Sequence, residues 1–237
     1  MNINNCKSIF PIIIFLAASI TSSLSFASDN NDKIYDPLEP VNRVFFQFNE
    51  YTDKFVLEPF IQVYDVTLPN VAKIGITNFF NNIDDVYSGL NQVLQARNTA
   101  ALQSAKRVAL NTTVGLVGLV DVASLDGIHR SHSDFGLTLG VWGFGAGPYV
   151  VLPILGPSTT RDAVGRGIRY VADFRTYLAP VPNYTLAGME IVDGKYVLKS
   201  TNRILGESSF DKYVFVRNAY VNNRRYNISI AKSAEDD

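Results

Sequence analysis

The sequence is poor in the residues that most often hold metal ions or form disulfides. Its 237 residues include one cysteine, Cys6, and two histidines, His129 and His132. Cys6 precedes an apolar N-terminal run, so removal of that run as a signal would leave no thiol, disulfide or cysteine-based metal site. Gly127 and Ser131 around the histidines favour a loop, whereas a metal would need both histidines on a helix beside a carboxylate. The sequence therefore predicts no metal site.

Motifs that mark common catalytic sites are also missing. The sequence has no nucleophile elbow, phosphate-binding loop or zincin motif. Glycines at Gly143, Gly145 and Gly147 are followed by Pro148 rather than by a helix, so they do not match a dinucleotide-binding loop. We therefore expect neither a cofactor nor an enzyme.

Neither sign of charge is in excess. The chain has 21 Lys and Arg against 22 Asp and Glu, without a polybasic stretch of the kind that binds nucleic acid. No nucleic-acid partner is predicted. The length allows one domain with its own core, and no repeat or low-complexity linker divides it.

The N-terminal apolar run is too short to cross a bilayer as a helix. Residues 9–20 are interrupted by Pro11 and fall below the ~20 residues that a spanning helix needs. Lys7 precedes the run and the small-x-small sequence of residues 25–27 follows it. Residues 1–27 are therefore typical of a cleaved secretory signal, with a membrane anchor as the alternative.

Cleavage after Ala27 would leave a mature domain of residues 28–237. Ser28 would then be its first residue, where an acylated lipoprotein would have a cysteine. From this position we expect a chain that is not a lipoprotein.

The centre of the sequence, residues 133–167, combines many glycines with large apolar side chains and little charge. Glycine costs a helix roughly 1 kcal/mol per position relative to Ala, so a long regular helix is not expected here. Alternation within residues 135–141 would allow a short strand. Such an apolar stretch needs a cover, either protein core or lipid. A mean hydropathy of +0.07 fits a protein that is partly solvated by lipid.

Three long blocks in this sequence resemble one family. They are DFGLTLGVWGFGAGPYVVLPILGPSTTRD in the centre, YDPLEPVNRVFFQFN near the start and VRNAYVNNRRY near the end. Together they are similar to the MlaA (VacJ) proteins of the Gram-negative outer membrane. The resemblance spans residues 35–226, nearly the whole expected mature chain.

The resemblance implies a mainly α, single-domain helical ring, with the glycine-rich centre as an irregular segment. Members of the family lie in the inner leaflet of the outer membrane, on its periplasmic side, and associate with trimeric porins. Through an amphipathic channel they pass phospholipid that is misplaced in the outer leaflet to a soluble periplasmic carrier, and they make or break no bond. Many carry an acylated cysteine directly after the signal. The alternatives are a soluble periplasmic lipid-binding carrier and, less well supported, a lipid hydrolase.

Residues 114–122 hold six large aliphatic side chains in a run that would be only ~14 Å long as a helix, against a hydrocarbon core of ~30 Å. The residues alone favour a buried helix end slightly, and the resemblance favours a hairpin tip that dips into lipid or lines a lipid path. The expected lipid-path or membrane-facing residues are Val114, Leu116, Val117, Leu119, Val120, Phe135, Trp142 and Tyr149.

Other positions in the three blocks are expected to have structural roles: Asp36, Pro37, Asn42, Arg43, Gly147, Pro148, Arg161 and Asp162. Asp36 can cap a helix whose first residue is Pro37, although Pro40 allows a later start. Thr159 and Asp162 are a capping pair for a helix near Arg161.

The remaining pattern predicts further helices. A break or kink is expected at residues 58–59, a helix from residues 67–69 to about 95, and another from Asn98. On the latter, Leu102, Ala105 and Ala109 are expected inward and Gln103, Lys106 and Arg107 outward.

Two features are predicted for the C-terminal part. The helix near Arg161 would contain i,i+4 ion pairs from Asp162 to Arg166 and from Arg169 to Asp173. Residues 179–183 would connect it to a helix over 185–205, and residues 208–211 would cap a last helix.

Overall fold

The protein is described by a computed structural model that covers residues 34–177, 180–206 and 211–234. The expected signal, residues 1–27, and its cleavage site lie outside the described residues. The described part is mainly helical, as predicted. Its longer α-helices are α2 (Glu39–Thr52), α3 (Glu58–Thr67), α4 (Asn70–Leu94), α5 (Asn98–Thr113), α8 (Thr160–Ala172), α9 (Pro180–Gly206) and α10 (Lys212–Ser233).

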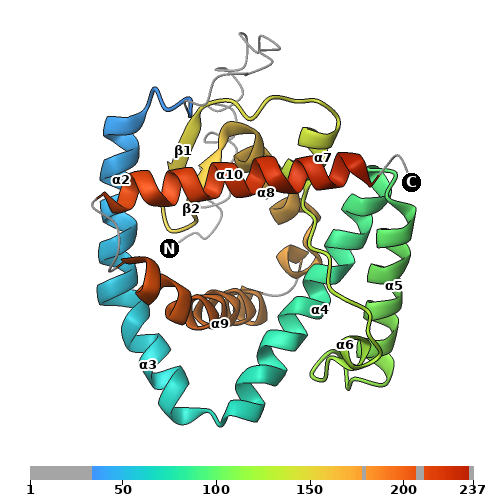
Figure 1. The fold of residues 1–237 in the computed structure, drawn as a ribbon. Helices are drawn as coiled ribbons and strands as arrows, with labels where there is room; N and C mark the ends of the chain where they lie inside the picture. Colours follow the sequence, from blue (N-terminus) through green and yellow to red (C-terminus); the bar gives the residue numbers. More distant parts are fainter. Residues whose placement is uncertain (1–33, 178–179, 207–210, 235–237) are drawn as a thin grey trace.

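The helices are arranged as a ring (Figure 1). α2 and α3 form one side, α4 with α5 packed against it forms the other, and α10 runs between the two sides at the end opposite the α3–α4 corner. α9 lies inside this frame and contacts α3 and α4. Within the described residues, no helix has both the length and the apolar content to cross a bilayer.

The first helix begins too late in the sequence for Asp36 to be its N-cap. α2 starts at Glu39, with Leu38 at the N-cap and Pro40 in its first turn, so the expectation that Asp36 caps and Pro37 opens the helix is wrong. Asp36 instead accepts hydrogen bonds from Asn42 Nδ2 at 2.9 Å and from the Tyr213 hydroxyl. Its carboxylate joins α2 to α10 rather than serving its own helix.

Pro59 does not break the helix. A π-helical turn, Asp53–Leu57, joins α2 directly to α3, and the Glu58 N–H donates to the Asp53 carbonyl five residues back. In a regular α-helix a proline lacks the N–H for a backbone hydrogen bond, and its ring clashes with the preceding turn. The wider π-helical turn before Pro59 keeps the chain helical here.

α4 and α5 lie side by side, and their contact is polar. α4 has the predicted bounds within a few residues, and α5 starts at Asn98, as predicted. The expected inward face of α5 is wrong: Leu102 is 57% exposed and Ala105 and Ala109 are exposed too, while Arg107, expected outward, is 2% exposed. Gln103 and Lys106 are exposed, as predicted. Ser104 Oγ donates to Gln92 Oε1 at 2.8 Å, and Gly89 lets the helices approach closely at Ser104. Polar and small residues at a contact between helices are typical of proteins solvated by lipid.

The glycine-rich centre starts as a helix, not as a strand. α7 (Phe135–Val141) is capped by Asp134, whose carboxylate accepts from the Leu137 N–H at 2.9 Å. Glycine serves close packing here, because a Cβ on Gly165 of α8 would lie 2.4 Å from the backbone nitrogen of Gly136. Residues 144–148 are irregular, as predicted, and lead into the antiparallel hairpin of β1 (Tyr149–Leu152) and β2 (Gly156–Thr159).

The C-terminal helices follow the predicted caps but not the predicted ion pairs. Thr159 caps α8 by accepting from the Asp162 N–H at 3.2 Å. Arg166 donates instead to the Leu155 and Pro157 carbonyls, and Arg169 to Asp84 of α4, so both i,i+4 pairs are wrong.

The ends of α9 and α10 also differ in part from the prediction. α9 already starts at Pro180, within the expected connector, and continues through residues 193–194. Asp211 caps α10, as predicted for the end of the 208–211 segment. A short 3₁₀ turn, Phe174–Tyr177, lies between α8 and α9.

The distribution of side chains is inverted relative to a water-soluble domain. Polar and charged residues outnumber apolar ones among the described buried positions, while large apolar side chains are exposed along α2, α3 and α4. A small apolar cluster, Tyr149, Val151, Tyr213 and Val221, packs the hairpin against α10. Exposed apolar surface on this scale marks contact with a membrane or with another protein.

Candidate functional site

A cavity of about 190 Å³ lies between α4, α7 and α8. Its lining is mostly apolar, and a small polar part comes from side chains such as Asp134 and Arg169. Leu90 and Leu94 of α4 and Ile168 of α8 contribute apolar wall and are themselves partly exposed, so the wall continues to the molecular surface. The other lining residues are Tyr87, Asn91, Asp134, Phe135, Arg169 and Ala172.

The polar part of the cavity belongs to a connected set of ion pairs, which we call the ionic network. It joins α4, α5, α8, α10 and the segment before α7. Its carboxylates and cations are Asp84, Asp85, Asp121, Asp134 and Asp162 with Arg107, Arg130, His132, Arg161, Arg169 and Arg224.

The carboxylate of Asp84 contacts three cationic side chains. It receives Arg169 Nη1 at 2.5 Å, Arg130 Nη2 at 2.6 Å and His132 Nδ1 at 2.7 Å. Burial alone would raise the pKa of Asp84, but contacts with these cations hold it at about 2. Asp84 is therefore ionised at neutral pH, and two of its cationic partners also face other carboxylates, Arg130 that of Asp85 and His132 that of Asp134.

His132 lies between two carboxylates. Hydrogen bonding to Asp134 and to Asp84 raises the pKa of His132 to about 9, against the opposing effect of burial. The imidazole is thus protonated at neutral pH. With His132 charged, the cations of the ionic network outnumber its carboxylates by one.

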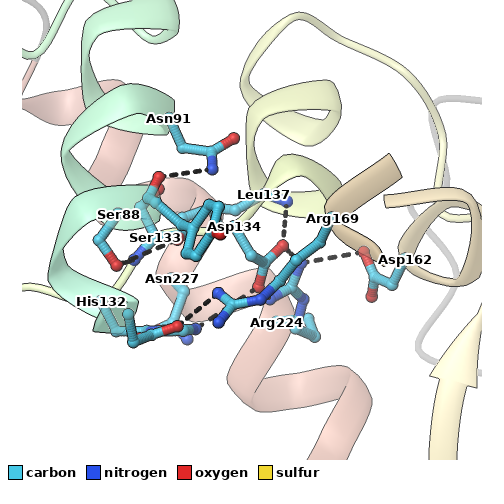
Figure 2. A network of polar contacts seen from close by, with 12 residues as sticks. Ser88, Asn91, His132, Ser133, Asp134, Leu137, Asp162, Arg169, Arg224 and Asn227 are labelled. Atoms are coloured by element: carbon cyan, nitrogen blue, oxygen red, sulfur yellow. Dashed lines mark hydrogen bonds and ion pairs between the residues drawn. The ribbon is translucent and has the colours of Figure 1, made fainter. Parts of the chain in front are cut away.

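Arg224 of α10 reaches into the same region. Figure 2 shows its guanidinium between Asp134 and Asp162, with contacts of 2.6 Å and 3.0 Å. Burial would raise the pKa of Asp134, but His132 and Arg224 lower it below its usual value. Arg224 therefore fixes α10 against the start of both α7 and α8.

Two of the expected lipid-path residues lie at this cavity or beside it. Phe135 lines it, and Trp142 packs edge to face on Phe135 with ring centroids 6.1 Å apart. The indole Nε1 donates to the Leu94 carbonyl at 2.9 Å, and the indole is half exposed.

The other aliphatic candidates form an exposed turn, residues 114–120, which we call the tip. Val114, Leu116, Val117, Leu119 and Val120 are all exposed, so a buried helix end is excluded. Leu116 and Val117 have φ values of +53° and +61°. An L-residue costs about 1–2 kcal/mol in this left-handed region, so the tip presents these side chains despite backbone strain. The tip lies away from the cavity, at the end of α5 near α6 (Val122–Leu125).

Tyr149 does not face the surface. It is 1% exposed in the apolar cluster between the hairpin and α10, with ring contacts to Tyr213 and Tyr220. Its expected membrane-facing position is wrong, because the alternation of β1 turns it inward.

The residues expected to be structural at the N-terminus join distant elements. Asn42 is buried, donates to the Tyr149 carbonyl and accepts from the Val151 N–H, each at 2.9 Å. Arg43 pairs with Asp211 at 2.8 Å and stacks over the Tyr213 ring. Pro37 lies in the turn before α2.

The central set has similar contacts. Gly147 has a φ of +68°, and the Pro148 carbonyl accepts from the Thr160 N–H at 3.0 Å. Arg161 donates to the Phe144 carbonyl, and Asp162 accepts from the Tyr220 hydroxyl at 2.8 Å and from Arg224. These contacts fit the expected structural role of these residues. That the residues act by holding the fold rather than in transport itself stays a prediction.

Sequence reasoning missed most of the cavity. Asp84, Asp134, Arg169 and Arg224 come from four separate segments, and nothing in their local spacing relates them. One usable signal was the density of charged residues on helices of an otherwise apolar protein, since charges in contact with lipid need partners.

No metal site is present in the part of the chain that the structure describes. No group of three or more His, Cys, Asp or Glu side chains there could hold an ion. His132 contacts carboxylates as an ion-pair partner, and His129 is placed in the loop after α6.

Comparison with known proteins gives a consistent result. A family model described as MlaA lipoprotein matches residues 34–227. The chain is 33% identical to the intermembrane phospholipid transport system lipoprotein MlaA of Escherichia coli, with 86% of this chain and 84% of that protein covered. It is 29% identical to the protein of the same name from Haemophilus influenzae, with coverage of 90% and 89%. An uncharacterized protein of Rickettsia conorii is 31% identical over 79% of this chain and 75% of its own.

The fold is also similar to a solved structure. That structure, described as the structural basis for maintenance of bacterial outer membrane lipid asymmetry, has a TM-score of 0.71 and 31% identity. The match covers 81% of this chain and 98% of the other.

One expectation from the sequence is overturned by these matches. The chain was expected not to be a lipoprotein because serine follows the predicted cleavage site. The family is described as a lipoprotein family, and the Escherichia coli and Haemophilus influenzae relatives are named as lipoproteins. The inference relied on a cleavage position within residues 1–33, which lie outside the described residues.

Proposed function

Because this chain belongs to the MlaA lipoprotein family, we propose that it removes misplaced phospholipid from the outer leaflet of the outer membrane and passes it toward the periplasm. The protein is associated with the outer membrane. It has a general role in lipid transport and in the maintenance of lipid asymmetry. The route, the direction and the partners are the proposed part. The proposed step is transport without a chemical reaction.

The inverted distribution of side chains is the observation that carries this proposal. The exposed apolar side chains of α2, α3, α4 and the tip suit a surface covered by acyl chains. The buried side chains are largely polar or charged, and several of them lie where α4 and α5 contact each other. A phospholipid needs both environments, because moving its charged headgroup into hydrocarbon without partners costs several kcal/mol.

A ring within one leaflet would provide the two environments together. We propose that the ring lies in the inner leaflet on the periplasmic side, where its exposed apolar side chains would contact acyl chains. The headgroup would follow an amphipathic channel while its acyl chains remain in lipid or against apolar wall. A trimeric porin beside the ring and a soluble periplasmic carrier below it are the partners that this route requires.

The tip provides a direct test in cells. A strain that lacks this protein is complemented with wild type or with the double variant Val117→Asp, Val120→Asp. Phosphatidylethanolamine at the cell surface is then measured with an amine reagent that does not cross the membrane. The wild type should lower the surface signal and the charged variant should not, because two carboxylates resist entry into lipid.

A control separates charge from shape. Val117→Thr with Val120→Thr preserves the side-chain volume without adding charge, and it should retain most of the activity. The charged variant should also fold, because both positions are exposed. Aggregation of the charged variant would indicate a core role for the tip, and a wild-type protein found in the soluble periplasm would favour a lipid-binding carrier.

A further inference from the structure

The cavity between α4, α7 and α8 combines a mostly apolar lining with one cation of the ionic network. Arg169 lines it and belongs to the ionic network. Leu90 and Ile168 carry the apolar wall outward to positions where their own side chains are partly exposed. A ligand that fits needs an anionic group at the inner end and an apolar group that leaves toward the surface.

From this arrangement we propose that the cavity is a headgroup site for one phospholipid, whose phosphate contacts Arg169 and whose first acyl carbons lie along Leu90 and Ile168. The inference rests on the proposed function and adds to it a place where transported lipid is held. The expected ligand is the phosphate of a lipid rather than free phosphate. An inorganic ion would leave the apolar wall without a partner.

The geometry of Arg169 supports an incoming anion. Among the described hydrogen bonds, its guanidinium donates once, from Nη1 to Asp84, and its Cζ lies 4.5 Å from the centre of the Tyr87 ring. A guanidinium has five N–H donors, so the other side of the fork can receive phosphate oxygens. Tyr87 holds the group in place by a cation–π contact.

The charge balance favours an anion at the same place. Arg130 pairs with Asp85 as well as with Asp84, and Asp134 is held by Arg224 and His132. Over the whole ionic network six cations face five carboxylates, so one positive charge is in excess. A phosphate diester carries one negative charge and would complete the ionic network without breaking an existing pair.

The volume limits what the cavity can hold. About 190 Å³ is the liquid volume of roughly six waters and is below the 300–1,000 Å³ of most pockets for drug-sized ligands. A phosphate with its glycerol and the start of one chain fits this range, whereas a whole lipid does not. The partly exposed Leu94 and Trp142 lie where the rest of the chain would emerge.

The test measures binding of dihexanoyl phosphatidylglycerol to the purified full chain in amphipol by titration calorimetry. Dihexanoylglycerol, which lacks the phosphate, and inorganic phosphate are the comparison probes. The wild type should bind the phospholipid at least tenfold more tightly than either probe. Equal binding of dihexanoylglycerol would overturn the headgroup site, and equal binding of inorganic phosphate would overturn the lipid assignment.

Two variants, each with a matched control, test the position. Arg169→Met should weaken phospholipid binding about tenfold, whereas Arg166→Met, one turn away on the same helix and bonded to the Leu155 and Pro157 carbonyls, should not. Leu90→Trp should fill the cavity from a partly exposed position, whereas Val86→Trp, one turn earlier on α4 and outside the cavity lining, should not. If Arg169→Met does not fold, the tryptophan pair decides. Equal effects within both pairs would refute the proposal.

Failure of this site is distinguishable from failure of the proposed function. Wild-type protein that lowers surface phospholipid in cells but shows no phosphate preference in the calorimeter retains its function and loses the headgroup site. Wild-type protein that does not lower surface phospholipid loses the proposed function, whatever the calorimeter shows.

Discussion

Buried charged residues stabilise this protein at positions where a soluble domain would have aliphatic side chains. Arg107 is the largest fully buried side chain, and its donors reach Asp85, Asp121, Ser124 and the Ile128 carbonyl at 2.6–3.1 Å. A buried guanidinium is tolerable only when nearly all of its donors are bonded. Arg107 thereby ties α5 to α4 and to the loop after α6.

Arg107→Ala should lower the free energy of unfolding by about 3–5 kcal/mol, because it leaves buried carboxylates with fewer partners. Urea unfolding in mild detergent, followed by circular dichroism, measures the change. Lys106→Ala is the control at the neighbouring exposed position and should change it by less than about 0.5 kcal/mol. Similar losses for both variants would mean that the buried pair contributes little.

His132 makes part of the stability dependent on pH. Its pKa is raised to about 9 in the folded state, above the ordinary value of 6.5, so its contribution is fully present below pH 6.5 and is lost as pH rises through 9. The thermal midpoint of the wild type should therefore exceed that of His132→Gln at pH 6, and the difference should shrink by pH 9.5. Thermal scans of both proteins at several pH values check this. A difference that grew with pH would contradict the charged state assigned to His132.

At the scale of elements, α9 is attached to the ring mainly by polar contacts. Asp193, 4% exposed, accepts from the Tyr64 hydroxyl at 2.7 Å and from Thr77 Oγ1 at 2.9 Å. Lys195 pairs with Asp53 of the π turn at 2.6 Å. These contacts join α9 to both sides of the α3–α4 corner.

Asp193→Ala should loosen α9 without unfolding the ring. Loss of the acceptor leaves two hydroxyl donors without it, each at a cost of about 1–3 kcal/mol if the donor stays buried. Hydrogen exchange measured by mass spectrometry should show faster exchange in α9 and unchanged exchange in α10. Asp193→Asn retains one acceptor oxygen and should lie between alanine and wild type; uniform acceleration across all helices would argue against local attachment.

The sequence predicted the helices better than their faces. The start of α5 at Asn98 and the Thr159 and Asp211 caps depend on local chemistry and were confirmed. Gln103 and Lys106 of α5 are exposed as predicted, but its apolar residues and Arg107 were assigned wrongly, because the rule that apolar residues point inward assumes water outside. For Leu102 and Arg107 the rule is reversed.

The cavity could not be predicted because its contacts are distant in sequence. Arg169 and Asp84 are 85 residues apart, and Arg224 and Asp134 are 90 apart. The i,i+4 spacing favours an ion pair between Arg169 and Asp173. In the structure Arg169 pairs with Asp84 on α4 instead. α7 was missed because the cost of its glycines is offset by the close approach of α8 at Gly136 and Gly165.

For the whole molecule, exposed apolar surface links stability to the surroundings. Detergent that covers this surface binds the folded ring, and a ligand at 100 times its Kd adds about 2.7 kcal/mol to the free energy of unfolding. The urea midpoint, followed by the fluorescence of the single tryptophan Trp142, should rise with non-ionic detergent concentration. For the charged tip variant, Val117→Asp with Val120→Asp, the urea midpoint should rise less with detergent than it does for the wild type. A midpoint independent of detergent would show that the exposed surface is not solvated by it.

The polar interior also has a thermal consequence. Newly hydrated apolar surface raises the heat capacity by about 0.45 cal/mol/K per Å², whereas newly hydrated polar surface lowers it by about 0.26. In this ring much of the apolar surface is already outside, and unfolding exposes many polar groups such as Arg107, Gln92 and Asp85. The heat-capacity increment in water should therefore fall below the ~12–15 cal/mol/K per residue of ordinary globular proteins. A small increment gives a broad, flat stability curve, so the protein should change little in stability between a cold and a warm environment.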